Sequence, residues 1–282
     1  MSVLLPLLAA VLQASSVTLD KAILRMRRVD FREYTGVSFP LLFLITLAAF
    51  LIVRPPFPLT LLGGSMGFLI LASSGMTVVT NIAYYRALDH DRLQEMETLG
   101  LLAAIPTIVG SGILFSDERN PAVLVPALIA AIAVIWSYWE RHHFAIARRT
   151  LPFLLWALAA GPAQAAVLKI LLASWNPISL ELVRSAITAA VFGMLFRQSM
   201  RPVSLHAFRF LLATNVLSAV AWFLFYFSYQ RSGVVYTVLL FSLQPLLVYL
   251  GSAVFLREPF HWKKFAAFQI VLGSIIAAEL LG

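Results

Sequence analysis

Two apolar stretches share the same arrangement of residues: "LGLLAAIPTIVGSGILFSDERNP" at 99–121 and "TVLLFSLQPLLVYLGSAVFLREPF" at 237–260. Each has a central proline, Pro106 or Pro245, and each ends in a glutamate twelve or thirteen residues further on. Each also follows an aromatic helix end, "IAYYRAL" in the first case and "LFYFSYQ" in the second. A match of this kind predicts an internal duplication.

The composition predicts an integral membrane protein. Of 282 residues, 61% are hydrophobic and only 12% are charged, which is about half the usual charged share of a soluble domain. Mean hydropathy is +0.88. Cysteine is absent, which excludes disulfides, a thiolate metal site and a cysteine nucleophile. We expect no cofactor and no metal. The net charge of +8 fits cytoplasmic loops better than nucleic-acid binding, because no basic run is long.

A bilayer needs about 20 largely apolar residues per helix. Ten segments qualify, and the connections between them are short: 3–24, 35–53, 59–85, 98–115, 121–139, 152–173, 178–196, 207–229, 233–256 and 264–281. The N-terminal stretch has no basic residue before its apolar core and no clear cleavage site, so we expect it to be a retained span. The chain is therefore predicted to be an all-α membrane protein with ten transmembrane helices.

The duplication divides these spans into two sets of five. Because five is odd, the second copy must lie upside down relative to the first, so we expect two inverted five-helix repeats at residues 1–143 and 150–282. Lys21 lies twelve residues before Glu33, and Lys169 lies twelve before Glu181. Lys169 is thus predicted to be the repeat partner of Lys21 on the opposite face of the membrane.

Basic residues are distributed unevenly between the two sides. The loops after spans 1, 3, 5, 7 and 9 hold sixteen of the 21 Lys and Arg residues. Such loops are usually cytoplasmic. We therefore expect both termini outside, in a protein of a bacterial inner membrane.

The sequence resembles the drug/metabolite transporter superfamily, in its EamA-type branch. The resemblance rests on "YYRAL", Pro106 and "FSDER" in the first half, on "FSYQRSG", Pro245 and "LREP" in the second, and on "VLKILLASWNPISLELVRSAITAAV" at 167–191. It implies an inverted-repeat transporter that works by alternating access, often as an exporter of amino acids or other small metabolites.

A substrate site is predicted near the middle of the bundle. Proline-broken spans at corresponding positions of two inverted halves point to a midplane site. Large amides that faced lipid unpaired would cost about 2–7 kcal/mol each, so they should face a shared cavity. Trp222 lies seven residues past Asn215 and shares its helix face. The candidate substrate-binding residues are Gln13, Asn81, Pro106, Gln164, Asn215, Trp222, Gln244 and Pro245.

Four charged residues near helix ends are candidates for gating or ion pairing: Lys21, Lys169, Glu181 and Arg184. Lys169 is expected to extend its ammonium outward or to pair with Glu181. Tyrosines near helix ends favour an interfacial belt rather than a site; these are Tyr84, Tyr85 and Tyr229.

No Asp, Glu or His lies near the middle of a span, and Asp20 and Lys21 are expected to neutralise each other at a helix end. This predicts an uncharged pocket and no proton coupling through a midplane carboxylate. We expect a secondary transporter of a neutral or zwitterionic solute such as an amino acid, working as a monomer or weak homodimer. The alternatives are a carrier of a lipid-linked or nucleotide-sugar-like substrate, a channel, and a non-transporting scaffold. An enzyme is not expected, because no catalytic motif is present.

Overall fold

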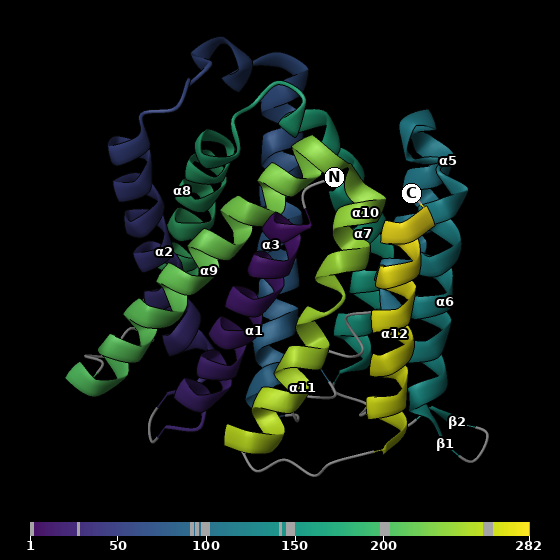
Figure 1. The fold of residues 1–282 in the computed structure, drawn as a ribbon. Coiled ribbons are helices and arrows are strands. Elements are labelled where there is room, and N and C mark those ends of the chain that lie inside the picture. The colour runs from purple at the N-terminus through teal and green to yellow at the C-terminus, as the bar shows by residue number, and fades with distance from the viewer. Residues whose placement is uncertain are drawn as a thin grey trace.

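The computed structural model describes residues 3–26, 29–90, 93, 96, 102–140, 143–144, 150–197, 204–255 and 262–281. Nearly all of these residues are helical (Figure 1). The helices are α1 (Leu4–Leu24), α2 (Phe31–Val53), η1 (Leu59–Leu62), α3 (Gly64–His90), α5 (Ala104–Leu114), η2 (Ser116–Glu118), α6 (Pro121–Tyr138), α7 (Leu151–Leu172), α8 (Pro177–Leu195), α9 (Leu205–Ser232), α10 (Val234–Phe241), α11 (Gln244–Phe255) and α12 (Trp262–Leu281). Two short strands, β1 (Trp139–Glu140) and β2 (His143–Phe144), form an antiparallel pair between α6 and α7.

The ten predicted spans correspond to these helices. Seven helical stretches are long and apolar enough to cross a bilayer, and α5, α6 and α12 supply the other three spans. The ninth span is divided, because α10 ends at Phe241 and α11 begins at Gln244. The all-α membrane architecture expected from the sequence is confirmed.

The helices pack in the pairs that an inverted duplication requires. In the duplication, α7 corresponds to α1 and α9 corresponds to α3. α1 lies along α9, and in the same way α7 lies along α3. α2 packs on its own counterpart α8, and α6 packs on its counterpart α12. Each half therefore completes the packing of the other half.

The two halves run in opposite directions through the bundle. Both chain ends lie at the upper end of the bundle, whereas the β1–β2 hairpin that precedes α7 lies at the lower end (Figure 1). α1 thus begins at one face and α7 at the other, which confirms the inverted arrangement. The boundaries at residues 1–143 and 150–282 stay a prediction, and Glu258, which the sequence matches to Glu118, lies outside the described residues.

The outer surface carries large exposed apolar side chains, as expected of a protein that is surrounded by lipid. Ile52, Phe68 and Met194 are 81%, 70% and 71% exposed. Polar groups instead gather where helices meet, because an unpaired polar group in hydrocarbon is costly. The start of α2 has a local cap: the Asp30 carboxylate accepts from the backbone N–H groups of Arg32 and Glu33.

The two matched prolines lie next to interruptions in their helical stretches, as expected of proline-broken spans. Pro106 is the third residue of α5, and Pro245 is the second residue of α11. Proline is well tolerated in a first helical turn, where its missing N–H would have no intrahelical partner. Ala103 and Ser242 keep right-handed helical backbone angles, so each proline follows a short interruption in a helical stretch.

Candidate functional site

A cavity of about 340 Å³ lies inside the bundle, between the two halves. Side chains from α1, α2, α3, α7, α8, α9, α10 and α11 form its wall. Six of the eight predicted substrate-binding residues line it: Gln13, Asn81, Gln164, Asn215, Trp222 and Gln244. The size is within the range typical of small-molecule sites. The role of these six residues in substrate binding stays a prediction.

A second cavity, of about 350 Å³, adjoins the first. The two share Gln164, Trp222 and Gln244 among their lining residues. Pro245 lines this second cavity, so it lies close to the predicted site. Pro106 belongs to the wall of neither cavity.

Asp20 lies in the wall of the first cavity and is only 3% exposed. Its Oδ1 accepts hydrogen bonds from Tyr34 Oη and Thr214 Oγ1, both at 2.5 Å, and its Oδ2 accepts from Tyr85 Oη at 3.1 Å. Lys21 is buried and donates to the carbonyl oxygen of Leu88. The prediction that Asp20 and Lys21 neutralise each other is wrong, because their side chains leave α1 toward different neighbours.

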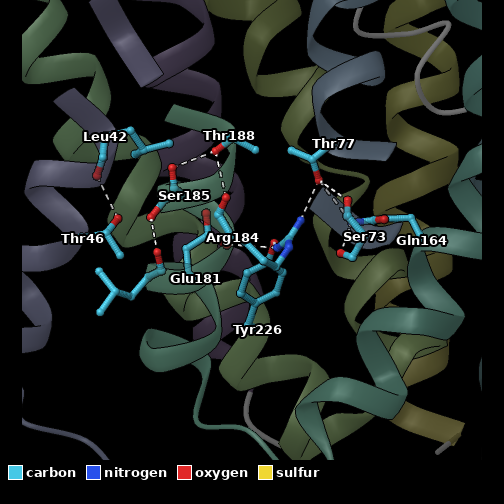
Figure 2. A network of polar contacts seen from close by, with 11 residues as sticks. Leu42, Thr46, Ser73, Thr77, Gln164, Glu181, Arg184, Ser185, Thr188 and Tyr226 are labelled. Carbon is cyan, nitrogen blue, oxygen red and sulfur yellow. Dashed lines mark hydrogen bonds and ion pairs between the residues drawn. The ribbon is translucent and has the colours of Figure 1, made fainter. Parts of the chain in front are cut away.

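A second polar network crosses the same cavity (Figure 2). Arg184 Nη1 lies 3.0 Å from Glu181 Oε2 and also donates to Tyr226 Oη, while Nη2 donates to Thr77 Oγ1 at 2.7 Å. Gln164 Nε2 donates to Ser73 Oγ at 3.0 Å beside this group. The network joins α8 to α3, α7 and α9 across the interface between the halves.

The expected pairing of Lys169 with Glu181 is therefore wrong. Lys169 Nζ lies 2.6 Å from Asp117 Oδ2 and 2.5 Å from Glu118 Oε1. It also lies 4.6 Å from the centre of the Phe115 ring, within cation–π range. Its ammonium does not simply extend into solvent, because η2 of the first half covers the end of α7. We call Lys169, Asp117 and Glu118 the end clamp.

Glu118 also caps the start of α10. Its Oε1 accepts from the backbone N–H of Val234 at 2.7 Å, and its Oε2 accepts from that of Val235 at 2.9 Å. A carboxylate at a helix N-terminus is stabilised by the unpaired N–H groups there. The neighbouring Asp117 is mostly exposed, and the hydrogen bond from Lys169 lowers the pKa of its carboxyl.

Gly233 makes the approach of Glu118 to α10 possible. Its φ is +83°, and a Cβ there would lie 2.8 Å from Glu118 Oε1. We expect Gly233→Ala to destabilise the protein by about 1–3 kcal/mol through backbone strain alone, with a further loss from the clash. The melting temperature in detergent measures this. Gly193→Ala is the control, because no atom lies within 4 Å of its Cβ position; equal melting temperatures for the two variants would contradict the close contact.

The aromatic residues near helix ends do not form a belt as predicted. Tyr84 and Tyr85 line the first cavity, and Tyr229 is 7% exposed and lines the second. The two cavities therefore extend to these helix ends. The prediction of an uncharged pocket is also wrong. Asp20, Glu181 and Arg184 each lie within two turns of a helix end, and all three line the first cavity.

Comparison with known proteins supports a transporter. Residues 150–278 match the EamA-like transporter family. A solved structure titled "Crystal structure of protein" has the same fold, with a TM-score of 0.74 and 17% identity over 99% of this chain and 97% of that chain. No curated protein matches the chain. The family match indicates a membrane transporter of small solutes and so agrees with the resemblance noted in the sequence.

Proposed function

We propose that the protein exports a small neutral or zwitterionic solute, such as an amino acid, and the match of residues 150–278 to the EamA-like transporter family supports this proposal. The observation that carries the proposal is the cavity itself. It is walled by helices of both halves and combines amides, one guanidinium and two carboxylates with aromatic surfaces. A zwitterion carries one positive and one negative group, and a wall with both carboxylates and a guanidinium can form ion pairs with each of them. No covalent chemistry is required of the protein.

We propose that transport proceeds by alternating access. The end clamp joins η2 of the first half to α7 and α10 of the second, so it can hold one end of the bundle closed. Inverted repeats allow the same halves to rock and to open the opposite end. The transporter acts as a monomer or weak homodimer in this proposal.

We propose that the ends of spans 1, 3, 5, 7 and 9 face the cytoplasm and that the membrane is a bacterial inner membrane, because the loops after these spans are basic. The end clamp then lies at the outer mouth. Both termini are expected outside. We expect a reporter that is active only in the cytoplasm to be inactive at the C-terminus and active in the loop at residues 198–203. Strong activity of the C-terminal fusion would reverse the orientation.

The cavity argues against the alternative of a nucleotide-sugar-like substrate. A diphosphate group needs several cationic side chains, whereas the cavity wall has one arginine beside two carboxylates. A non-transporting scaffold would not need a polar cavity between its two halves. Neither alternative is favoured by a specific contact among the described residues.

Exchange in proteoliposomes tests the proposed function. Vesicles loaded with one amino acid are placed in the same radiolabelled amino acid, and label uptake is followed without any ion gradient. The expected result is accumulation of label that requires unlabelled amino acid inside. Failure of every neutral amino acid, together with exchange of a nucleotide sugar, would replace the proposed substrate class by the alternative one.

A further inference from the structure

We propose that Asp20 is the amine-recognition residue of the cavity, and that the substrate binds there through a protonated amino group. This inference deepens the proposed function and rests on it. It assigns a role to a carboxylate that the sequence suggested was neutralised at a helix end.

The burial of Asp20 is the first argument. An ionisable side chain within a membrane span is costly and usually marks a substrate or ion pathway. Asp20 is 3% exposed and lines the first cavity. Among the described residues, its partners are three hydroxyl groups, and no lysine, arginine or histidine lies within ion-pair distance of its carboxylate.

The hydrogen bonds leave room for one more donor. A carboxylate offers about four acceptor positions. Oδ1 uses two of them, for Tyr34 and Thr214, and Oδ2 uses one, for Tyr85. The hydroxyls therefore orient the carboxylate without neutralising it. One position on Oδ2 remains for an N–H group.

The charge balance of the cavity points to a cation. Three charged side chains line it. Arg184 and Glu181 pair with each other at 3.0 Å. Asp20 is therefore the one charged group of the described wall without an ion pair, and its ionised form gives this wall one net negative charge. Two aromatic rings, Tyr34 and Tyr85, lie beside the carboxylate with centroids 4.8 Å apart. Ring faces attract an ammonium ion in addition to the ion pair.

A matched ligand series tests this assignment. The purified full-length protein is melted in detergent with 2-phenylethylamine, 2-phenylethanol or phenylacetate at equal concentrations. The shared aromatic ring suits the aromatic wall, and only the polar group differs. We expect the amine alone to raise the melting temperature of the wild type. Asp20→Asn should weaken its binding about 10–100-fold, the value of a hydrogen bond to a charged group.

Asp89→Asn is the control variant, because it removes the same charge at the end of α3 and lines neither cavity. It should bind the amine as the wild type does. Equal stabilisation by the amine and the alcohol, unchanged amine binding in Asp20→Asn, or no stabilisation by the amine overturns the proposal. The wild-type ligand order decides the matter even if Asp20→Asn does not fold.

The outcome is separable from that of the proposed function. Amino acid exchange in proteoliposomes without an amine preference in the melting series would leave the transporter proposal standing and would remove the role of Asp20. Amine binding through Asp20 without exchange of any amino acid would support the role of Asp20 and contradict the proposed amino acid transport.

Discussion

Lys169→Met is expected to lower exchange in proteoliposomes at least tenfold. The change removes the cation of the end clamp but leaves the Glu118 carboxylate, which is 6% exposed, in place. Removing one partner of a buried ion pair costs about 3–5 kcal/mol. A bias of that size between two conformations changes their ratio more than a hundredfold. The closed outer mouth is then too rarely populated for a full transport cycle.

Two further variants separate the end clamp from a general loss of folding. Asp117→Asn should have a small effect, because the Asp117 side chain is 69% exposed and exposed ion pairs contribute little. Lys169→Met with Glu118→Gln should recover part of the exchange, because no unpaired charge remains buried. Normal exchange by Lys169→Met alone would show that the clamp has no gating role.

Arg184→Met is expected to abolish exchange and to lower stability by about 3–5 kcal/mol, the cost of leaving a buried charge unpaired. Arg184 contacts Glu181, Tyr226 and Thr77 at once (Figure 2). Without the guanidinium, Glu181 becomes a second uncompensated carboxylate in the cavity. The melting temperature in detergent and the exchange rate in vesicles measure the two effects.

Arg184→Lys tests the geometry of the network separately from its charge. An ammonium is a compact charge on a flexible stem and cannot reproduce the planar fork of a guanidinium. We expect it to restore much of the stability but little of the exchange. Arg184→Met combined with Glu181→Gln should also recover stability. An Arg184→Lys variant with full exchange would reduce Arg184 to a charge-balancing residue.

The fold was predictable because lipid restricts it severely. The bilayer sets a length of about 20 apolar residues for each span, and the duplication sets the inverted pairing of the halves. Packing of α1 on α9 and of α7 on α3 follows from that symmetry. The break between Phe241 and Gln244 was less visible, since a proline alone does not reveal whether a helix bends or begins.

The polar contacts of the site were harder to predict, because they join residues far apart in the chain. Thr214 lies 194 residues from Asp20, and Glu118 lies 51 residues from Lys169. The sequence also shows where a residue lies along a helix but not whether its side chain lines a cavity. One signal was present: Gln13, Ser16 and Asp20 are three and four residues apart and so share one helix face. All three line the cavity.

The pairing of α1 with α9 has a consequence for biosynthesis. α1 is among the first segments to leave the ribosome, and α9 follows about 200 residues later. Asp20 must therefore enter the bilayer before Thr214 has been made. During translation it has to be sheltered by Tyr34 and Tyr85 of the next two helices or by the insertion machinery, which makes the order of synthesis part of the folding problem.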